Sequence, residues 1–133
     1  MNLAAVMDEI ATTLSSVPGL RVWGYPPGSV TPPAAVVGYP VEHQYDVTYG
    51  RGMDAMTIPV VVVVPNPTER PARDAVSAYT AGTGVSSVKA VLESASYTAL
   101  HSIRVASVAY DTYSIGGAEY LGAIFEVEIT GSG

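Results

Sequence analysis

The stretch IPVVVVVPNP, at residues 58–67, limits the possible folds more than any other, because it places five consecutive valines between two prolines. A strand with one face in water alternates apolar and polar residues, and this one does not. We therefore predict a strand that is covered on both faces. A second layer or a neighbouring subunit is expected to contact Val61 and Val63. Helices are expected to cover the other set of valines, namely Val60, Val62 and Val64.

The composition indicates a domain that hides much of its surface. Hydrophobic residues make up 48% of the 133-residue chain and charged residues 14%, whereas about 25% is usual in soluble domains. The chain has no cysteine, which excludes disulfides, thiolate zinc sites and a cysteine nucleophile. A net charge of −6 with six basic residues argues against binding nucleic acid by phosphate neutralisation. Burial in an assembly would account for so few charges.

The start of the chain argues against a signal peptide. MNLAAVMDEIATTL has no basic leading segment, and it carries Asp8 and Glu9 within its apolar pattern. The longest apolar run, at residues 58–65, is too short to cross a bilayer as a helix. We expect a protein that is made in the cytoplasm and has no membrane partner.

Apolar spacing and chain breakers predict the remaining elements. Apolar residues at three- and four-residue spacing predict a helix over residues 3–16, with Asn2 as its N-cap. An alternating stretch, a glycine-bracketed turn and the valine strand predict a β-hairpin over residues 41–64, with Arg51 at its tip. Pro59 lacks an N–H, which predicts a bulge or an edge position near the start of that strand. The other predicted elements are short strands over 20–25 and 34–40, a broken helix over 70–94 and a C-terminal β-hairpin over 103–130.

This order of elements predicts a single α+β domain over residues 1–133, with an antiparallel or mixed sheet of about four to six strands. The N-terminal helix and the broken central helix are expected to pack on one face of that sheet. The broken helix offers the sheet a set of apolar residues: Ala72, Val76, Tyr79, Val85, Val88, Val91 and Leu92. These helices cannot cover both faces.

Catalytic signatures are weak. The histidines are His43 and His101, and no G-x-S-x-G elbow accompanies them, so we interpret both as surface or cross-strand residues. Glu126 and Glu128 lie two apart on one predicted strand and therefore share a face. They could bind a metal or act as an acid and base pair, but a solvated sheet face is the simpler interpretation. We predict no catalytic residue, no cofactor and no metal site.

Other polar residues have simple explanations too. Asp8 and Glu9 are interpreted as helix surface and Asp54 as a turn former. GTGVSSVK, at residues 82–89, departs from the phosphate-binding loop because Lys89 does not directly follow the last glycine. We interpret this stretch as the break between two helical pieces.

The chain resembles the tail-terminator, or tail-completion, proteins of long-tailed bacteriophages, especially those that infect actinobacteria. Three stretches carry the resemblance in order: MDEIATTLSSVPGLRVWGYPPGSVTPPAAVVGYP, then VEHQYDVTYGRGMD, then MTIPVVVVVP. The two-piece helix and the final hairpin complete it, so the likeness covers nearly the whole chain. The order and lengths of the elements match, rather than any single motif.

The resemblance implies a structural α+β subunit of the virion tail and neck, assembled in the bacterial host cytoplasm. Its copies would form a hexameric ring on the last ring of the tail tube, end tube polymerisation and offer a surface to the head-completion proteins. The family has no catalytic residues to carry over. DNA would pass the lumen without specific binding, and an acidic protein suits such a channel. Glu126 and Glu128 are candidate lumen-facing acids, while the candidate contacts to a subunit or partner are Arg51, Val61 and Val63.

Two alternatives remain open. One is another neck or tail component, such as a head-tail stopper or a tube subunit, although the N-terminal helix argues against a tube subunit. The other is a small α+β hydrolase that uses His43 or His101 with a carboxylate.

Overall fold

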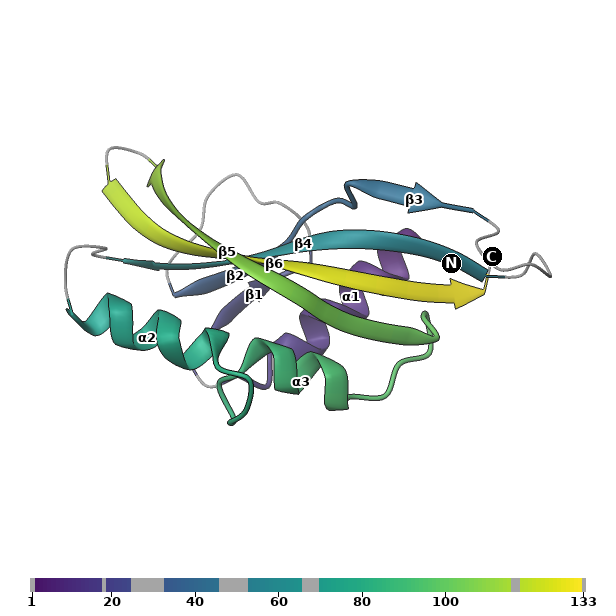
Figure 1. Ribbon diagram of the computed structural model, residues 1–133, viewed down its shortest axis with the longest axis horizontal. Helices are drawn as coiled ribbons and strands as arrows, with labels where there is room; N and C mark the ends of the chain where they lie inside the picture. The colour runs from purple at the N-terminus through teal and green to yellow at the C-terminus, as the bar shows by residue number, and fades with distance from the viewer. Residues whose placement is uncertain are drawn as a thin grey trace.

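A mixed sheet with helices against one face makes up the part of the chain that the computed structural model describes, which is residues 2–17, 19–24, 33–45, 53–65, 70–115 and 118–132 (Figure 1). The elements follow in the order α1 (Leu3–Leu14), β1 (Arg21–Trp23), β2 (Ala34–Val37), β3 (Glu42–Gln44), β4 (Met53–Pro65), α2 (Arg70–Thr80), α3 (Val88–Ser94), β5 (Ser102–Ile115) and β6 (Ala118–Ser132). The predicted α+β class is confirmed.

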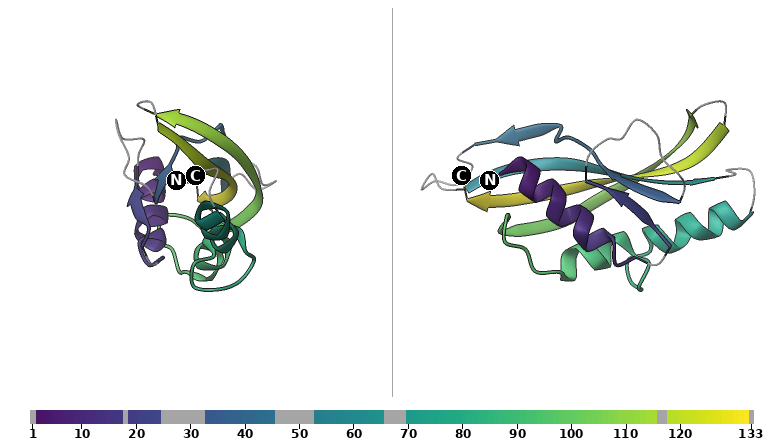
Figure 2. Two further views of the ribbon diagram at one scale, coloured as in Figure 1. Left: turned by 90° about the vertical axis from the view of Figure 1, so that its left-hand side faces the viewer. Right: turned by 180° about the vertical axis from the view of Figure 1, so that it is seen from behind.

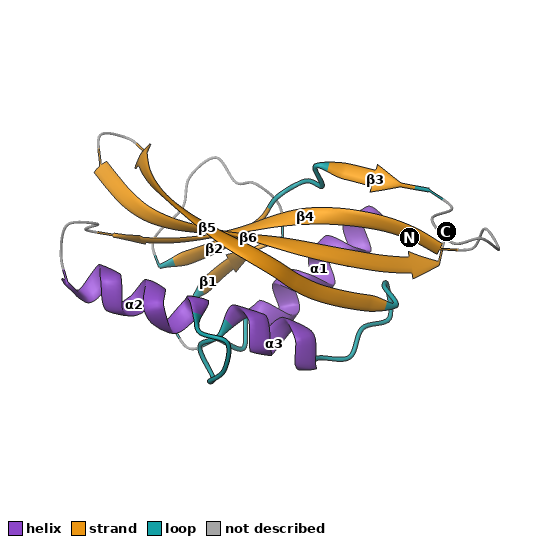
Figure 3. Cartoon of the chain, in the orientation of Figure 1, coloured by secondary structure: helices purple, strands orange, loops and turns teal. Residues whose placement is uncertain are grey.

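The valine strand β4 lies in the middle of the six-stranded sheet, whose main path is β1-β2-β4-β6-β5 (Figure 3). β6 pairs with β4 along its whole length on one edge, while β2 and β3 pair with different parts of the other edge. β1 and β2 are parallel and the remaining pairs are antiparallel, so the sheet is mixed. β3 and β4 confirm the strands of the predicted hairpin, but residue 51 at its tip lies outside the described residues.

The inner face of the sheet, defined as the face that the helices contact, holds the hydrophobic core. Val60, Val62 and Val64 are all buried there, as predicted, and their β6 partners are Phe125, Ala123 and Leu121. Burying each such valine contributes about 1.5 kcal/mol or more. The helices add to the same cluster a further set of buried residues: Val6, Met7, Ile10, Leu14, Ala72, Val76, Tyr79, Val88 and Leu92.

Helix α1 begins at the predicted cap. The Ala5 N–H donates to Oδ1 of Asn2 at 3.1 Å, which satisfies a backbone donor at the helix start. The helix ends at Leu14, two residues before the predicted end, with Ser15 as its C-cap.

The central helix is broken as predicted, but its second piece begins later than expected. Gly84 has a φ of 109°, a backbone conformation that favours glycine, and Ser87 then caps α3 by accepting from the Ala90 N–H at 3.1 Å. Val85 was predicted to face the sheet, and this is wrong. It precedes the cap, and it is 77% exposed.

Asp54 also departs from the prediction. It was interpreted as a turn former, yet it lies within β4, paired with Gly131, and only 4% of it is exposed. β4 begins at Met53, so Asp54 belongs to this strand and not to the predicted turn.

Pro59 lies opposite a two-residue bulge. Val37 pairs with Val60 and Glu42 pairs with Thr57, so residues 38–41 face only two residues of β4. The Gly38 N–H donates to the Pro59 carbonyl at 2.8 Å. The N and the C=O of one strand residue point to the same edge of the strand. The N–H that proline lacks is therefore absent on the side of this bulge, and the hydrogen bonds between β4 and β6 are not affected. The predicted bulge is confirmed, although Pro59 is in the middle of β4 rather than near its start.

Candidate functional site

The outer face of the sheet, opposite the helices, is the candidate site. Figure 2 shows the described helices on the other side of the sheet, and their buried residues join the core cluster of the inner face. Strand register places Thr57, Pro59 and Val61 of β4 on the outer face, beside Glu128, Glu126 and Ile124 of β6. None of the described helices covers this surface.

One end of the outer face is acidic. A hollow of about 470 Å³ there is lined by residues from β3, β4, β5 and β6, including Glu42, Glu126 and Glu128. Arg104 Nη1 donates to Glu128 at 3.2 Å, and the Ser107 hydroxyl donates to Glu126 at 3.2 Å. Three carboxylates and one guanidinium therefore line the hollow, so its lining carries net negative charge.

An apolar region adjoins this acidic hollow. Val61 and Ile124 face each other across β4 and β6, and Val36 and Trp23 continue the row onto β2 and β1. All four are half-buried. A second hollow of about 420 Å³ joins the two regions, because it is lined by Ile124, Pro59 and Val41 together with Glu42 and Glu126. An apolar row with flanking carboxylates suits contact with another protein surface.

The predicted interface residues differ in their exposure. Val61 is half-buried on the outer face and can still contact a partner. Val63 lies between Ala34 and Gly122 on the neighbouring strands, and only 5% of it is exposed, so it has little surface to offer. The third predicted contact, Arg51, lies outside the described residues.

The predicted lumen-facing acids are brought together. Glu126 and Glu128 share the outer face, where Glu126 is exposed and Glu128 is half-buried. The structure adds Glu42 from β3. Thr57 of β4 pairs with Glu42 on one side and with Glu128 on the other, so a single strand separates the two glutamates. Sequence spacing alone could not join it to this group, because β3 and β6 meet only through β4.

Glu9 holds a loop rather than lying free on the helix surface. Its carboxylate accepts from the Thr98 N–H at 2.8 Å, the Thr98 hydroxyl at 2.7 Å and the Ala99 N–H at 2.7 Å. The backbone hydrogen bond from Thr98 is the main cause that lowers the pKa of Glu9, against the opposing effect of desolvation. Glu9 therefore lies on the helix surface, as interpreted, but it also binds a loop that the interpretation did not foresee. Its partners are so distant in sequence that no local pattern could reveal them.

Glu93 plays a similar part between α3 and β5. It accepts from Lys89 Nζ at 2.6 Å and from the Val105 N–H at 2.9 Å. The register of β5 against β6 shifts between Val105 and Ser107, and Glu93 satisfies the backbone donor at this bulge. The Lys89 hydrogen bond is the largest cause that lowers the pKa of Glu93.

The histidines of the hydrolase alternative lie on different elements. His43 is in β3, paired with Met56, and its side chain is outside the described part. His101 is exposed in the turn before β5, where its backbone N–H donates to the Thr130 carbonyl at 2.7 Å. Among the residues that the structure describes, no group of three or more His, Cys, Asp or Glu side chains could hold a metal ion.

No protein-family model matches the chain, and the search of curated proteins finds no match. Within the described ranges, every helix is too short or too polar to pass through a lipid bilayer.

Proposed function

We propose that this protein is a tail terminator of a long-tailed bacteriophage. Its copies form a ring, with hexameric order, at the head-proximal end of the tail tube. The ring ends tube polymerisation and presents a joining surface to the head-completion proteins of the neck. DNA passes through its lumen without specific binding, and the mature location is the virion.

The observation that carries this proposal is the one-sided cover of the sheet. The described helices bury the inner face, whereas the outer face presents the half-buried apolar pair Val61 and Ile124 beside three carboxylates. Monomeric proteins rarely leave such a contiguous surface without a partner. The segment that joins β2 to β3 and the residue after β3 add exposed apolar side chains, namely Tyr39, Val41 and Tyr45.

The low charge content supports the same proposal. With 14% charged residues, the chain has fewer charged side chains than soluble domains usually place on a surface exposed to water. Assembly on the tube would remove part of the apolar surface from water. The order of elements resembles that of the tail-terminator family, and from this resemblance we infer that the assembly is a ring on the tail tube.

The experiment measures tube length. The tail-tube protein that functions with this chain is polymerised with increasing amounts of the purified protein, and tubes are measured in negatively stained electron micrographs. We expect short tubes of limited length with a ring at one end. Tubes that grow to the same length with and without the protein would contradict the proposal. So would a monomer that hydrolyses model esters, because that result favours the hydrolase alternative.

A further inference from the structure

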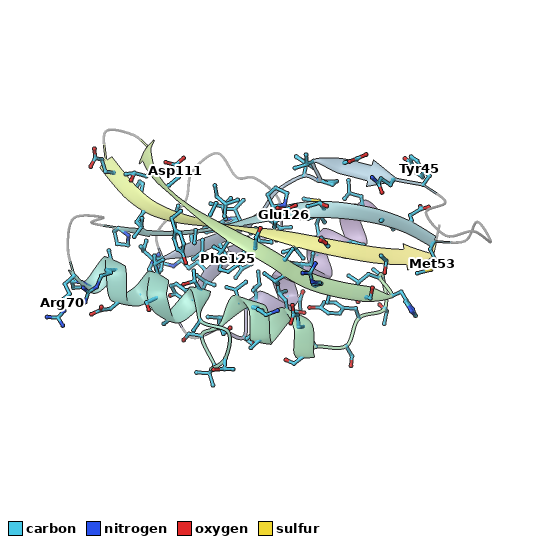
Figure 4. All side chains as sticks on the ribbon, viewed as in Figure 1. Tyr45, Met53, Arg70, Asp111, Phe125 and Glu126 are labelled. Atoms are coloured by element: carbon cyan, nitrogen blue, oxygen red, sulfur yellow. The ribbon has the colours of Figure 1, made fainter. Side chains whose placement is uncertain are left out.

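β5 ends the main path of the sheet, so one edge of this long strand has no neighbouring strand among the described elements. Its first part lies near α3, whereas Figures 1 and 2 show its second part rising away from α2. Residues 107–112, with the sequence SVAYDT, contain no lysine and no proline, two residues that commonly protect an edge strand. We call residues 107–112 the free edge of β5. Figure 4 labels Asp111 within it.

One hydrogen bond shows which backbone groups of the free edge point away from β6. The Thr112 N–H donates to Oδ1 of Asp111 at 2.8 Å, so it does not belong to the β6 ladder. The N–H and C=O of one residue point to the same edge of a strand, and the direction alternates from residue to residue. Val108 and Tyr110 occupy the alternate positions before Thr112, after the bulge of β5. Their N–H and C=O groups therefore point outward as well.

The side chains of the free edge suit a strand that pairs. Val108, Tyr110 and Thr112 lie on the side of the inner face, because their β6 partners belong to that face. Valine, tyrosine and threonine are all residues that favour strands. Tyr110 is 57% exposed although it lies within the sheet. On the outer side the free edge carries only Ala109 and Asp111, and both are exposed.

We propose that the free edges of two copies pair as antiparallel strands, with Tyr110 opposite Tyr110 of the second copy. In this register Val108 lies opposite Thr112, so outward backbone groups meet outward backbone groups and each finds a partner. The cross-strand pairs are tyrosine with tyrosine and valine with threonine, which are of the kinds that stabilise sheets. The charge of Asp111 lies opposite Ala109 and not opposite a like charge.

The sequence about Tyr110 selects this register and a second copy as the partner. A shift of two residues in one direction would place Asp111 directly opposite Asp111, and like charges directly opposite destabilise a sheet. A shift of two residues in the other direction would place Thr112 opposite Ala106, at the bulge of β5. A shift of one residue would set outward backbone groups against residues whose groups already bond to β6.

The contact goes beyond the proposed function and does not depend on it. Both copies use the same surface, so the contact closes with two copies and cannot repeat around a ring. It describes the protein before it joins a tube. Pairing also displaces the Asp111 carboxylate from the Thr112 N–H, because that N–H then donates to the Val108 carbonyl of the second copy. Asp111 therefore limits the strength of the contact.

Disulfide trapping tests the register, because the chain contains no cysteine of its own. In the paired form the two Tyr110 Cα atoms lie about 5.5 Å apart, a spacing that a disulfide can bridge. The two Thr112 Cα atoms lie roughly 13 Å apart along the strands, which is too far. Under mild oxidation Tyr110→Cys should therefore give about ten times the linked dimer of Thr112→Cys. Equal yields overturn the proposal.

Sedimentation equilibrium measures the dimer without cross-linking. A strand-edge contact is small, so we expect a dimer Kd of about 10–100 µM for the unmodified protein. Tyr110→Pro should raise this Kd at least about tenfold, because proline lacks the outward N–H while the β6 ladder is not affected. A protein that stays monomeric at about 1 mM overturns the proposal.

Asp111→Ala provides the opposite arm, because it removes the acceptor that competes for the Thr112 N–H. It should lower the dimer Kd about threefold. A tighter dimer cannot result from a misfolded chain. An Asp111→Ala dimer no tighter than the unmodified one overturns the pairing.

Tube length separates this contact from the proposed function. Dimerisation by a protein that leaves tube length unchanged keeps the contact and removes the terminator role. A protein that shortens tubes but shows no dimer in sedimentation keeps the role and removes the contact.

Discussion

At the scale of single residues, a few side chains join elements that are far apart in sequence. Glu9 on α1 holds the loop before β5, and Glu93 on α3 holds the bulge of β5. Both carboxylates accept backbone N–H groups that would otherwise lack a partner in the ladder or loop. Hydrogen bonds to a charged acceptor are among the stronger ones in proteins.

Replacing Glu9 tests this role through pH. The pKa of Glu9 is lowered in the folded state, so its contribution to stability is fully present above its ordinary pKa of 4.5 and is lost as the pH falls below it. We expect Glu9→Gln to lower the free energy of unfolding by about 1 kcal/mol at neutral pH, a value reduced by its partial exposure. The difference between the variant and the unmodified protein should shrink as the pH falls below 4.5. Urea unfolding at several pH values measures this, and a difference that does not change with pH would contradict it.

Gly38 lies close against Pro59 of β4. A Cβ added there would lie 2.9 Å from Pro59 Cγ and 3.1 Å from the Pro59 carbonyl oxygen. We expect Gly38→Ala to destabilise the protein by about 1–3 kcal/mol through overpacking. Gly82→Ala is the matched control, because a Cβ there meets nothing within 4 Å. Thermal unfolding compares the two variants. Equal melting temperatures would contradict the expectation, because they would mean that the bulge accepts an added Cβ without loss of stability.

At the scale of elements, repeating patterns were the reliable guide. The three- and four-residue spacing located α1, and continuous apolar character located β4 and the valines that face the helices. Proline and glycine residues indicated where hairpins turn and where helices stop. The patterns failed at the start of α3, which depends on a single capping residue. The apolar spacing that predicted this helix extends back to Val85, whereas α3 begins only after its Ser87 cap.

The outer face shows a second limit of such patterns. Strand periodicity correctly joined Glu126 with Glu128, but it could not predict that Glu42 lies near them or that Val63 is buried while Val61 is not. These facts depend on which strands pair and in which register. Pairing between distant strands has no local signature in a single sequence.

The cap of α3 is a clear target at this scale. Ser87 is buried, its hydroxyl accepts from the Ala90 N–H and donates to the Ala81 carbonyl, and α3 begins directly after it. We expect Ser87→Ala to lower the free energy of unfolding by about 1–2 kcal/mol. Ser77→Ala, at an exposed position inside α2, should cause no loss. Denaturant unfolding measures both, and a similar value for the two variants would argue against the cap.

At the scale of the whole molecule, the question is what contacts the outer face. Val61→Lys should keep the fold, because the lysine stem can lie on the apolar row while its ammonium reaches water. The same ammonium should block close contact with a partner. Under the proposed terminator role, tubes assembled with this variant should grow about as long as tubes assembled with no added protein.

Val85→Lys is the control for this prediction, since Val85 is highly exposed and lies in the turn before α3. Under the proposed role, this variant should shorten tubes as well as the unmodified chain. Tube lengths in electron micrographs decide the matter, with melting temperatures recorded for both variants. Normal capping by a folded Val61→Lys chain would place the partner on another surface.

The pairing of β4 with β6 has a consequence for synthesis of the protein. β4 is made early, yet Val60 and Val62 find their partners Phe125 and Ala123 only when β6 emerges from the ribosome. During that interval a run of valines with strong β-propensity has one unpaired edge, which is the situation in which nascent chains associate with each other. We expect this protein to depend on a chaperone that binds unfinished chains, and to aggregate when translation stalls before β6.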